Sequence, residues 1–317
     1  MKSKILITGG AGFIGSNFAR KFLKNGEEVH LIVRPKSDLW RIDSVKDLLN
    51  LHLIDLTDAN QVEKFIYELQ PQIILHFAAH PGYTGKDEDV KPTINTNMLG
   101  TVNLINACSK IFFRCFINTG SSSEYGVKDI PIKESDIPEP NNLYGVTKLA
   151  GTLYGQFMAK KFDLPIIAMR LFSPYGYYDR ARLIPAVING FLRNVEYINL
   201  NSPTSMRDYI FIEDIIDVYM RAIENVEMAK GEVFNIASGR QYSAADVVAL
   251  IREITHSSVQ IRYGIMKAKQ YEPANWIADI SKAQKIFKWE PCVSLIEGLE
   301  KTIIWFKKHM NFYEGYF

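Results

Sequence analysis

Residues 8–15 read Thr8-Gly9-Gly10-Ala11-Gly12-Phe13-Ile14-Gly15, directly after a short β-branched, apolar run. Glycines three apart allow a tight turn, a close approach of the backbone to a pyrophosphate, and packing of a helix on a strand. The N-terminus of that helix offers free N–H groups and a partial positive charge to phosphates. A purely structural turn is the alternative, but a position that opens a βαβ unit favours a dinucleotide site. The expected cofactor contacts here are Gly9, Gly12, Phe13, Ile14 and Gly15.

Short apolar runs alternate with longer helical patterns through the first half of the chain. Strands are predicted at residues 4–8, 29–33, 51–55, 72–77, 115–119 and 165–171, and helices at 13–25, 59–69, 95–110 and 144–162. Near-continuous apolar strands separated by helices indicate parallel strands that are covered on both faces. We therefore expect an α/β fold with a doubly wound parallel (Rossmann) sheet, which binds ligands outside the carboxyl ends of its strands.

The alternation becomes irregular after Leu171, where Pro, Tyr, Asn and Arg gather in residues 173–182 and 199–207. This change predicts a second, smaller α/β domain that holds the substrate. We expect the dinucleotide-binding domain to comprise residues 1–172 plus about 207–236. The second domain is then expected to comprise about 173–206 plus 237–317.

Composition excludes several classes of protein. The formal net charge is +2 and no block of like charges occurs, so no nucleic-acid or anionic-membrane partner is expected. The cysteines are three and have no paired spacing, which argues against a disulfide framework and a zinc site. No apolar stretch is long enough to span a membrane. A soluble, cytoplasmic protein without a metal site is the expectation.

The second predicted strand bears on the choice of cofactor. An NAD site typically has an acidic residue at the end of this strand, where it binds the ribose 2′-hydroxyl. Here Arg34 holds that place, followed by Lys36, whereas Glu27 and Glu28 come too early. A guanidinium is suited to bidentate contact with a 2′-phosphate, although an arginine on an exposed loop is the alternative. NADP(H) is therefore favoured, with NAD(H) as the alternative.

Three further cofactor contacts are expected near the adenosine and the neighbouring strand ends. Asp55 ends the third predicted strand and is placed to accept from the adenine amino group. It is equally suited to be a loop residue that leads into a helix capped near Thr57 or Asp58. Leu56 and Ala78 complete this predicted group.

The segment Tyr144-Gly145-Val146-Thr147-Lys148 begins a long predicted helix. Residues four apart lie on one helical face, so Tyr144 and Lys148 point the same way. A nearby ammonium favours the phenolate and lowers a phenol's pKa, which makes tyrosine an acid or base for a secondary alcohol near neutral pH. The lysine is also placed to hold the nicotinamide ribose. Such a pair alone is typical of a solvated surface, so a catalytic role depends on whether other polar groups lie nearby.

Those other groups lie at the predicted end of the fifth strand, which reads Asn118-Thr119-Gly120-Ser121-Ser122-Ser123-Glu124-Tyr125-Gly126. A serine hydroxyl at this edge is placed to bond a substrate oxygen as its charge changes. A serine-rich turn without a function is the alternative. Asn97 is a third polar element, although an asparagine inside a helix is often simply solvated.

Taken together, the motifs resemble the extended short-chain dehydrogenase/reductase family, whose members are mostly nucleotide-sugar epimerases, dehydratases, decarboxylases and reductases. The resemblance spans nearly the whole chain. It is carried by the glycine loop, His76-Phe77-Ala78-Ala79, Asn97-x-x-Gly100-Thr101, the serine-rich turn, Tyr144-x-x-x-Lys148, Arg207-Asp208-Tyr209-Ile210, and the terminal Ala278-Asp279 and Trp289-Glu290-Pro291 segments.

The resemblance implies a role for each matching residue. Tyr144 is the implied acid/base, Lys148 its pKa-lowering and ribose-binding partner, and Ser121 the binder of the substrate hydroxyl. Asn97 matches a proton-relay or helix-bending asparagine, and Arg207 an arginine that contacts the nucleotide diphosphate. Ser122, Ser123 and Ser173 stand at the other substrate positions. Hydride would pass between sugar C4 and nicotinamide C4, and a homodimer would form through the helices at 95–110 and 144–162.

Departures from the family pattern limit which of the family's reactions we expect. Dehydratases and related decarboxylases place a glutamate two residues before the tyrosine of the Tyr-Gly pair, and many dehydratases have an aspartate before it. Ser123 and Ser122 stand there, so dehydration is not expected. Glu124 lies one residue later, and a slip of one residue in a strand sends a side chain to the opposite face.

The remaining departures favour reduction of a 4-keto-6-deoxy nucleotide sugar. Glutamate directly before Tyr-Gly resembles some such reductases, and residues 33–37 resemble NADP-using relatives. Tyr271-Glu272-Pro273 lacks an arginine that many UDP-sugar epimerases have, and Ser173 replaces a common asparagine, although glucuronate-type epimerases also carry a small hydroxyl residue there. The alternative is a 4-epimerase with tightly bound NAD, and a remote one is a non-catalytic cofactor-sensing protein.

Overall fold

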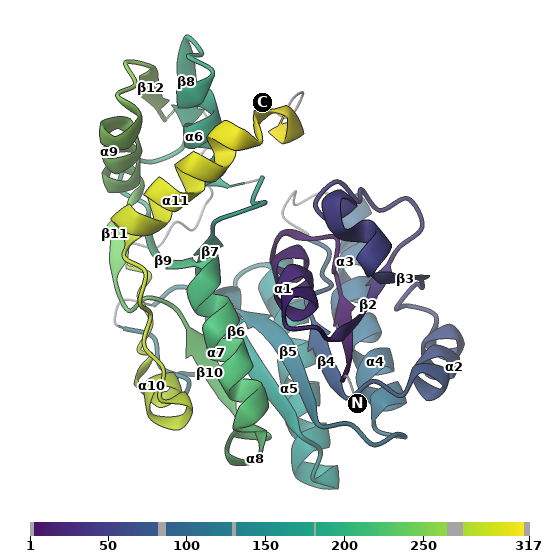
Figure 1. The fold of residues 1–317 in the computed structure, drawn as a ribbon. Helices are drawn as coiled ribbons and strands as arrows, with labels where there is room; N and C mark the ends of the chain where they lie inside the picture. The colour runs from purple at the N-terminus through teal and green to yellow at the C-terminus, as the bar shows by residue number, and fades with distance from the viewer. Residues whose placement is uncertain (1–2, 82–86, 129–130, 181, 265–274, 314–317) are drawn as a thin grey trace.

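A seven-stranded parallel sheet forms the larger part of the protein, as the computed structural model in Figure 1 shows. The structure describes residues 3–81, 87–128, 131–180, 182–264 and 275–313. In spatial order the strands are β10 (Val233–Ile236), β6 (Ile166–Leu171), β5 (Cys115–Ser121), β4 (Ile73–His76), β1 (Lys4–Thr8), β2 (Glu28–Val33) and β3 (Asn50–Leu53). The predicted doubly wound Rossmann sheet is confirmed.

Helices cover both faces of this sheet, which explains why its strands are apolar almost throughout. On one face lie α1 (Phe13–Lys24) and α7 (Ile212–Glu224), and on the other α2 (Ala59–Leu69), α4 (Gly100–Cys108) and α5 (Leu143–Phe162). Within β1, Ile5 and Ile7 pack into one core and Leu6 packs into the other. Every second side chain therefore serves a different layer.

Two predicted elements differ from the observed ones. The third strand ends at Leu53, so Asp55 lies two residues beyond it, in the turn before α2. The helix predicted at 95–110 is preceded by α3 (Val90–Ile94) and a π-helical turn, Asn95–Leu99, before α4 begins. The π turn lies in a segment whose side chains form hydrogen bonds to neighbouring elements. The periodicity of a helix in the sequence does not reveal such hydrogen bonds.

Among the described residues, two smaller sheets and three helices form a second part above the carboxyl edge of the main sheet (Figure 1). One sheet contains β11 (Gln241–Ser243), β9 (Met206–Phe211) and β7 (Ser173–Tyr175), and the other contains β12 (Gln260–Tyr263) and β8 (Tyr197–Leu200). The helices are α6 (Leu183–Leu192), α9 (Ala244–Thr255) and α11 (Leu295–Lys308).

The chain crosses between the two parts more than once. After β9, helices α7 and α8 (Val226–Ala229) and strand β10 return to the main sheet. Late in the chain, α10 (Ser281–Phe287) packs against α7 and β10, although the predicted division placed it in the second domain. The domain boundaries themselves stay a prediction.

The order of the strands defines where a ligand is expected. From β1 the chain proceeds to β2 and β3 on one side, and then to β4, β5 and β6 on the other. Connections on opposite sides leave a crevice at the carboxyl ends of β1 and β4. Among the described residues, no helix combines the length and the apolar character needed to cross a membrane.

Candidate active site

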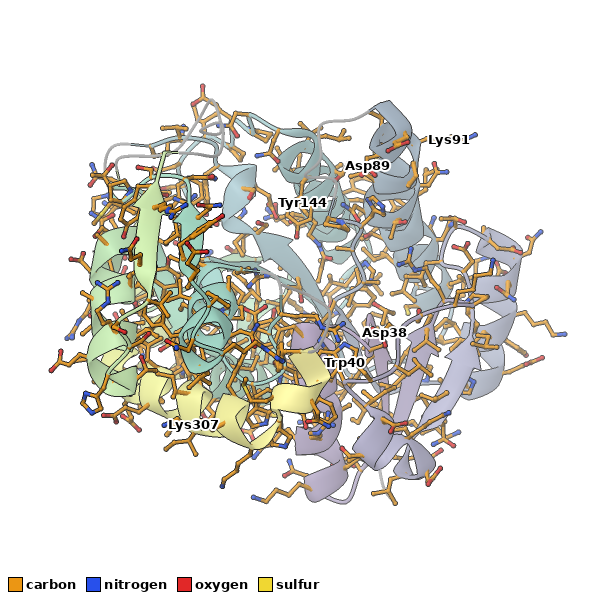
Figure 2. The ribbon with its side chains drawn as sticks, turned by 90° about the horizontal axis from the view of Figure 1, so that it is seen from above. Asp38, Trp40, Asp89, Lys91, Tyr144 and Lys307 are labelled. Carbon is orange, nitrogen blue, oxygen red and sulfur yellow. The ribbon has the colours of Figure 1, made fainter. Side chains whose placement is uncertain are left out.

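A cavity of about 1160 Å³ lies at this carboxyl edge, between the main sheet and the second part. It brings together most of the residues that the sequence singles out. They are Gly9, Gly12, Phe13, Ile14, Gly15, Ser121, Ser122, Ser123, Tyr144, Lys148, Ser173 and Arg207. Figure 2 shows Tyr144 at this edge, with Asp89, which also lines the cavity, on the neighbouring segment.

The glycine loop has the shape that a dinucleotide requires. Gly9 has a φ of +67°, and a Cβ there would lie 2.7 Å from the backbone nitrogen of Ala78. A Cβ at Gly15 would lie 2.4 Å from the carbonyl oxygen of Gly9, so only glycine lets α1 approach the loop this closely. At Gly12 a Cβ would contact only that same oxygen, at 3.0 Å, so this side of the loop is open to the cavity. The loop and the N-terminus of α1 therefore fit a pyrophosphate.

The remaining predicted cofactor contacts lie outside the cavity lining. Arg34 is exposed directly after β2, where its backbone N–H donates to Ser37 Oγ at 3.1 Å. Asp55 is exposed, and its carboxylate accepts from the backbone and hydroxyl of Thr57, both at 2.9 Å. Leu56 is buried beside α4, and the backbone N–H of Ala78 donates to Thr8 Oγ1 at 3.2 Å.

Tyr144 and Lys148 occupy the first turns of α5. The N-cap residue of this helix is Asn142, whose side chain accepts from the backbone N–H of Gly145 at 2.8 Å. Lys148 is almost fully buried, and burial lowers its pKa to about 8, an effect that the nearby Glu124 carboxylate partly opposes. Burial and the Lys148 charge lower the pKa of His76 to about 3, so a neutral imidazole lies beneath the lysine.

An asparagine on an ordinary helix surface is solvated, but Asn97 is not. It is buried, and its side chain accepts from the backbone N–H of His80 at 2.6 Å and donates to the His80 carbonyl at 3.0 Å. Its Nδ2 also donates to Thr147 Oγ1 at 3.1 Å, and that hydroxyl donates to the Tyr144 carbonyl. Asn97 thus joins the segment after β4 to the start of α5, within the π-helical turn.

Ser121 ends β5 and caps the short helical turn that follows. Its Oγ accepts from the backbone N–H of Ser123 at 3.1 Å, and its backbone N–H donates to Glu124 Oε1 at 2.8 Å. Glu124 is fully buried and pairs with Arg170 at 2.7 Å, and it also accepts from Thr152 Oγ1. Its side chain therefore supports the serine turn from the core side, opposite the cavity.

The second part supplies side chains that the sequence reasoning missed. Arg182 precedes α6, lines the cavity, and lies 5.8 Å from the ring of Phe13 in the glycine loop. Trp276 also lines the cavity, and its indole N–H donates to Ser122 Oγ at 3.2 Å. Arg182 ends the stretch 173–182, whose proline, tyrosine and arginine content was a usable signal, whereas no local pattern identifies Trp276. The segment 271–273 lies outside the described residues.

A glycine loop at the crevice of a doubly wound sheet, with a Tyr–Lys pair and a serine turn in the same cavity, defines a short-chain dehydrogenase/reductase of the extended type. Within the described residues no cluster of three or more His, Cys, Asp or Glu suits a metal ion. The sequence profile of the NAD dependent epimerase/dehydratase family matches residues 5–237. The chain therefore belongs to this family of enzymes, as its sequence motifs predicted.

Individual relatives carry several activities. The chain is 24% identical to a UDP-glucose 4-epimerase of Mycoplasma pneumoniae, over 98% of both proteins. It is 27% identical to a dTDP-4-dehydro-6-deoxyglucose reductase of Escherichia coli, over 95% of this chain and 97% of that protein. Its fold matches a UDP-glucuronic acid 4-epimerase from Bacillus cereus, solved with UDP-glucuronic acid and NAD, at 30% identity and a TM-score of 0.87, over 96% and 99% of the two chains.

Proposed function

We propose that this enzyme transfers hydride at C4 of a nucleotide sugar, and that its net reaction is the reduction of a 4-keto-6-deoxy sugar. The observation that carries the proposal is the shared cavity of Ser121, Tyr144, Lys148 and the glycine loop. The names of the relatives, which are C4 epimerases and a 4-keto-6-deoxy-sugar reductase, support chemistry at this carbon. Serines at positions 122 and 123, together with the inward-facing Glu124, argue against dehydration.

Each proposed residue has a distinct part in the chemistry. When bound on the glycine loop, the nicotinamide cofactor supplies or accepts the hydride. Tyr144 donates a proton to the C4 oxygen on reduction and removes it on oxidation. The Ser121 hydroxyl donates to the same oxygen, and the Lys148 ammonium favours the phenolate and binds the nicotinamide ribose. Arg207 and Ser173 line the cavity from the second part. Arg207 is assigned to the nucleotide diphosphate and Ser173 to another part of the substrate.

Replacing Tyr144 by phenylalanine tests the acid/base assignment. Loss of the phenol is expected to reduce kcat about 10²- to 10⁴-fold while cofactor binding stays within about twofold. Steady-state kinetics and a fluorescence titration with NADPH measure the two effects. Tyr67→Phe, on the exposed face of α2, is the matched control and is expected to change neither. Undiminished turnover in Tyr144→Phe would refute the assignment.

The net reaction is distinguished by following the cofactor. The purified protein is incubated with NADPH or NADH and with 4-keto-6-deoxyglucose linked to dTDP, UDP, GDP or CDP. In separate reactions it is incubated with the corresponding nucleoside-diphosphate sugars that carry a hydroxyl at C4. A reductase consumes one reduced cofactor for each sugar reduced. The second candidate, a 4-epimerase with tightly bound NAD, is favoured by the NAD-containing relative. Interconversion of C4 epimers without loss of NADPH would establish it and overturn the reductase proposal.

Arg34 supports NADP(H) as the cofactor, because a guanidinium rather than a carboxylate follows β2. The family name and the NAD-containing relative favour NAD instead, so affinity must decide. We expect NADPH to bind at least tenfold more tightly than NADH, and Arg34→Ala to remove most of this difference. Arg114→Ala, at the amino end of β5, is the control. Equal affinities in the wild type would exclude the NADP assignment.

A cytoplasmic homodimer completes the proposal. On the two helices predicted to form the interface, Leu104 belongs to the monomer core, whereas Leu153 and Phe157 are exposed on α5. An exposed apolar face on this helix supports a second copy as its partner. Light scattering of the wild type and of the Leu153→Glu/Phe157→Glu double variant tests it, with a change from dimer to monomer expected.

A further inference from the structure

Trp276 lies on a segment that is held by the second part of the molecule, and it lines the cavity. Its segment is fastened to the second part by side chains: Gln241 Oε1 accepts from the Trp276 backbone N–H at 2.7 Å, and Gln241 Nε2 donates to Asn275 Oδ1 at 2.9 Å. The buried Asp208 carboxylate accepts from the Ala278 backbone N–H at 3.1 Å. With its backbone held on both sides, the indole has a defined position.

The indole then contacts the first part directly. Its N–H donates to Ser122 Oγ at 3.2 Å, one residue after Ser121. Its ring lies 6.3 Å from the ring of Phe172, which follows β6, and 5.9 Å from the Arg207 guanidinium. These residues all line the cavity. The indole therefore contacts Ser122, next to the proposed C4 site, and lies near Arg207, the proposed diphosphate contact.

We propose that Trp276 is a specificity-determining residue that selects a 6-deoxyhexose, an inference that rests on the proposed C4 chemistry. The indole face and Phe172 present carbon atoms to this part of the sugar. The indole N–H already donates to Ser122 Oγ, so it offers no free donor to the sugar. A C6 methyl group packs on such a wall without loss.

A C6 hydroxyl at the same position weakens binding. It loses its water and finds no acceptor on the indole, which has only a donor. Discrimination against such a group by an apolar pocket amounts to about 10- to 100-fold. Trp276 thus determines which sugar is accepted without taking part in the hydride transfer.

Binding of two sugars that differ by one oxygen tests the proposal. Calorimetric titrations of the NADP⁺-loaded protein compare the nucleoside-diphosphate glucose with the corresponding 6-deoxyglucose, each linked to dTDP, UDP, GDP or CDP. The 6-deoxy compound is expected to bind at least tenfold more tightly. Trp276→Ala is expected to bring the ratio of the two Kd values close to one. Trp276→Phe, which keeps a flat apolar wall but loses the N–H, is expected to retain most of the ratio.

The outcomes separate this proposal from the proposed function. Equal affinity of the wild type for both sugars, or an unchanged ratio in Trp276→Ala, would overturn the role of Trp276 and leave the C4 chemistry intact. Failure of every nucleotide sugar to bind would overturn both. Thermal unfolding and cofactor affinity are measured for both variants. Values close to those of the wild type show that a change in the ratio comes from the loss of the indole and not from a loss of folding.

Discussion

Single buried charges set the energetics of the candidate site, and Lys148 is the clearest case. Burial lowers its pKa from 10.5 to about 8, so below pH 8 the folded protein carries an ammonium that water would solvate better. This costs about 3 kcal/mol of the free energy of unfolding at pH 7. The cost falls as pH rises from 8 to 10.5, because the unfolded chain still holds a proton that the folded protein has released.

Lys148→Met is therefore expected to raise the free energy of unfolding by up to about 3 kcal/mol at pH 7 and to abolish catalysis. The gain is expected to shrink toward zero near pH 10.5. Urea unfolding at several pH values measures it. Lys160→Met, on the exposed face of the same helix, serves as the control and is expected to change stability by less than about 0.5 kcal/mol. A gain that does not depend on pH would contradict the assigned cause.

Glu124 illustrates the opposite case, a buried charge that is fully paired. Its carboxylate accepts from Arg170, Thr152 and the backbone of Ser121. Glu124→Gln leaves the Arg170 charge without a counter-ion, and we expect a loss of about 3–5 kcal/mol. The exposed pair of Glu63 with Lys110 gives the control, because Glu63→Gln is expected to cost less than about 1 kcal/mol. Similar losses in both variants, measured in urea, would show that the buried pair contributes nothing special.

At the scale of elements, the contact between α1 and the loop before it depends on one glycine. A Cβ at position 15 would lie 2.4 Å from the Gly9 carbonyl oxygen, so Gly15→Ala must displace the loop or the helix. We expect cofactor affinity to fall at least tenfold in a fluorescence titration. Gly155→Ala on α5 meets only ordinary contacts, from 3.5 Å, and is expected to leave affinity unchanged and to stabilise the helix by about 0.5–1 kcal/mol. Unchanged affinity in Gly15→Ala would refute the assigned role of the loop.

Elements with strong local signals were predictable from the sequence, and those determined by distant partners were not. The glycine loop after β1 and the apolar strands of the main sheet were identified because periodicity and glycine spacing are local. The π-helical turn at Asn95–Leu99 was missed, since it contains Asn97, which bonds His80 and Thr147 far away in the sequence. Glu124 faces Arg170, 46 residues later, and Trp276 meets Ser122, 154 residues earlier, so neither contact leaves a local pattern.

At the scale of the whole molecule, a cluster of aromatic and charged side chains joins the segment Met310–Tyr313 to the loop after β2. Figure 2 shows Asp38 and Trp40 of this loop near the end of α11, the helix that carries Lys307. The ring of Trp40 lies 5.5 Å from that of Phe312. The second part of the molecule is thus tied to a loop that begins at Arg34, the predicted cofactor contact.

Arg180 joins the three segments of this cluster. Its guanidinium lies 4.3 Å from the ring of Trp40, pairs with Asp38 at 3.2 Å and donates to the Phe312 carbonyl at 2.9 Å. Arg180→Lys keeps the charge, but an ammonium cannot stack and bridge at once. We expect the free energy of unfolding to fall by about 1–2 kcal/mol and amide hydrogen exchange in α11 to accelerate.

The same variant tests whether this cluster holds the cavity closed. Asp179, beside Arg180, lines the cavity, so a loosened cluster is expected to raise KM for the nucleotide sugar severalfold with little change in kcat. Arg221→Lys on α7 is the control, because Arg221 also pairs with a carboxylate and a carbonyl, those of Asp217 and Lys288, but at the surface. Faster exchange in α11 with an unchanged KM would mean that the cluster stabilises the C-terminal helix without shaping the substrate site.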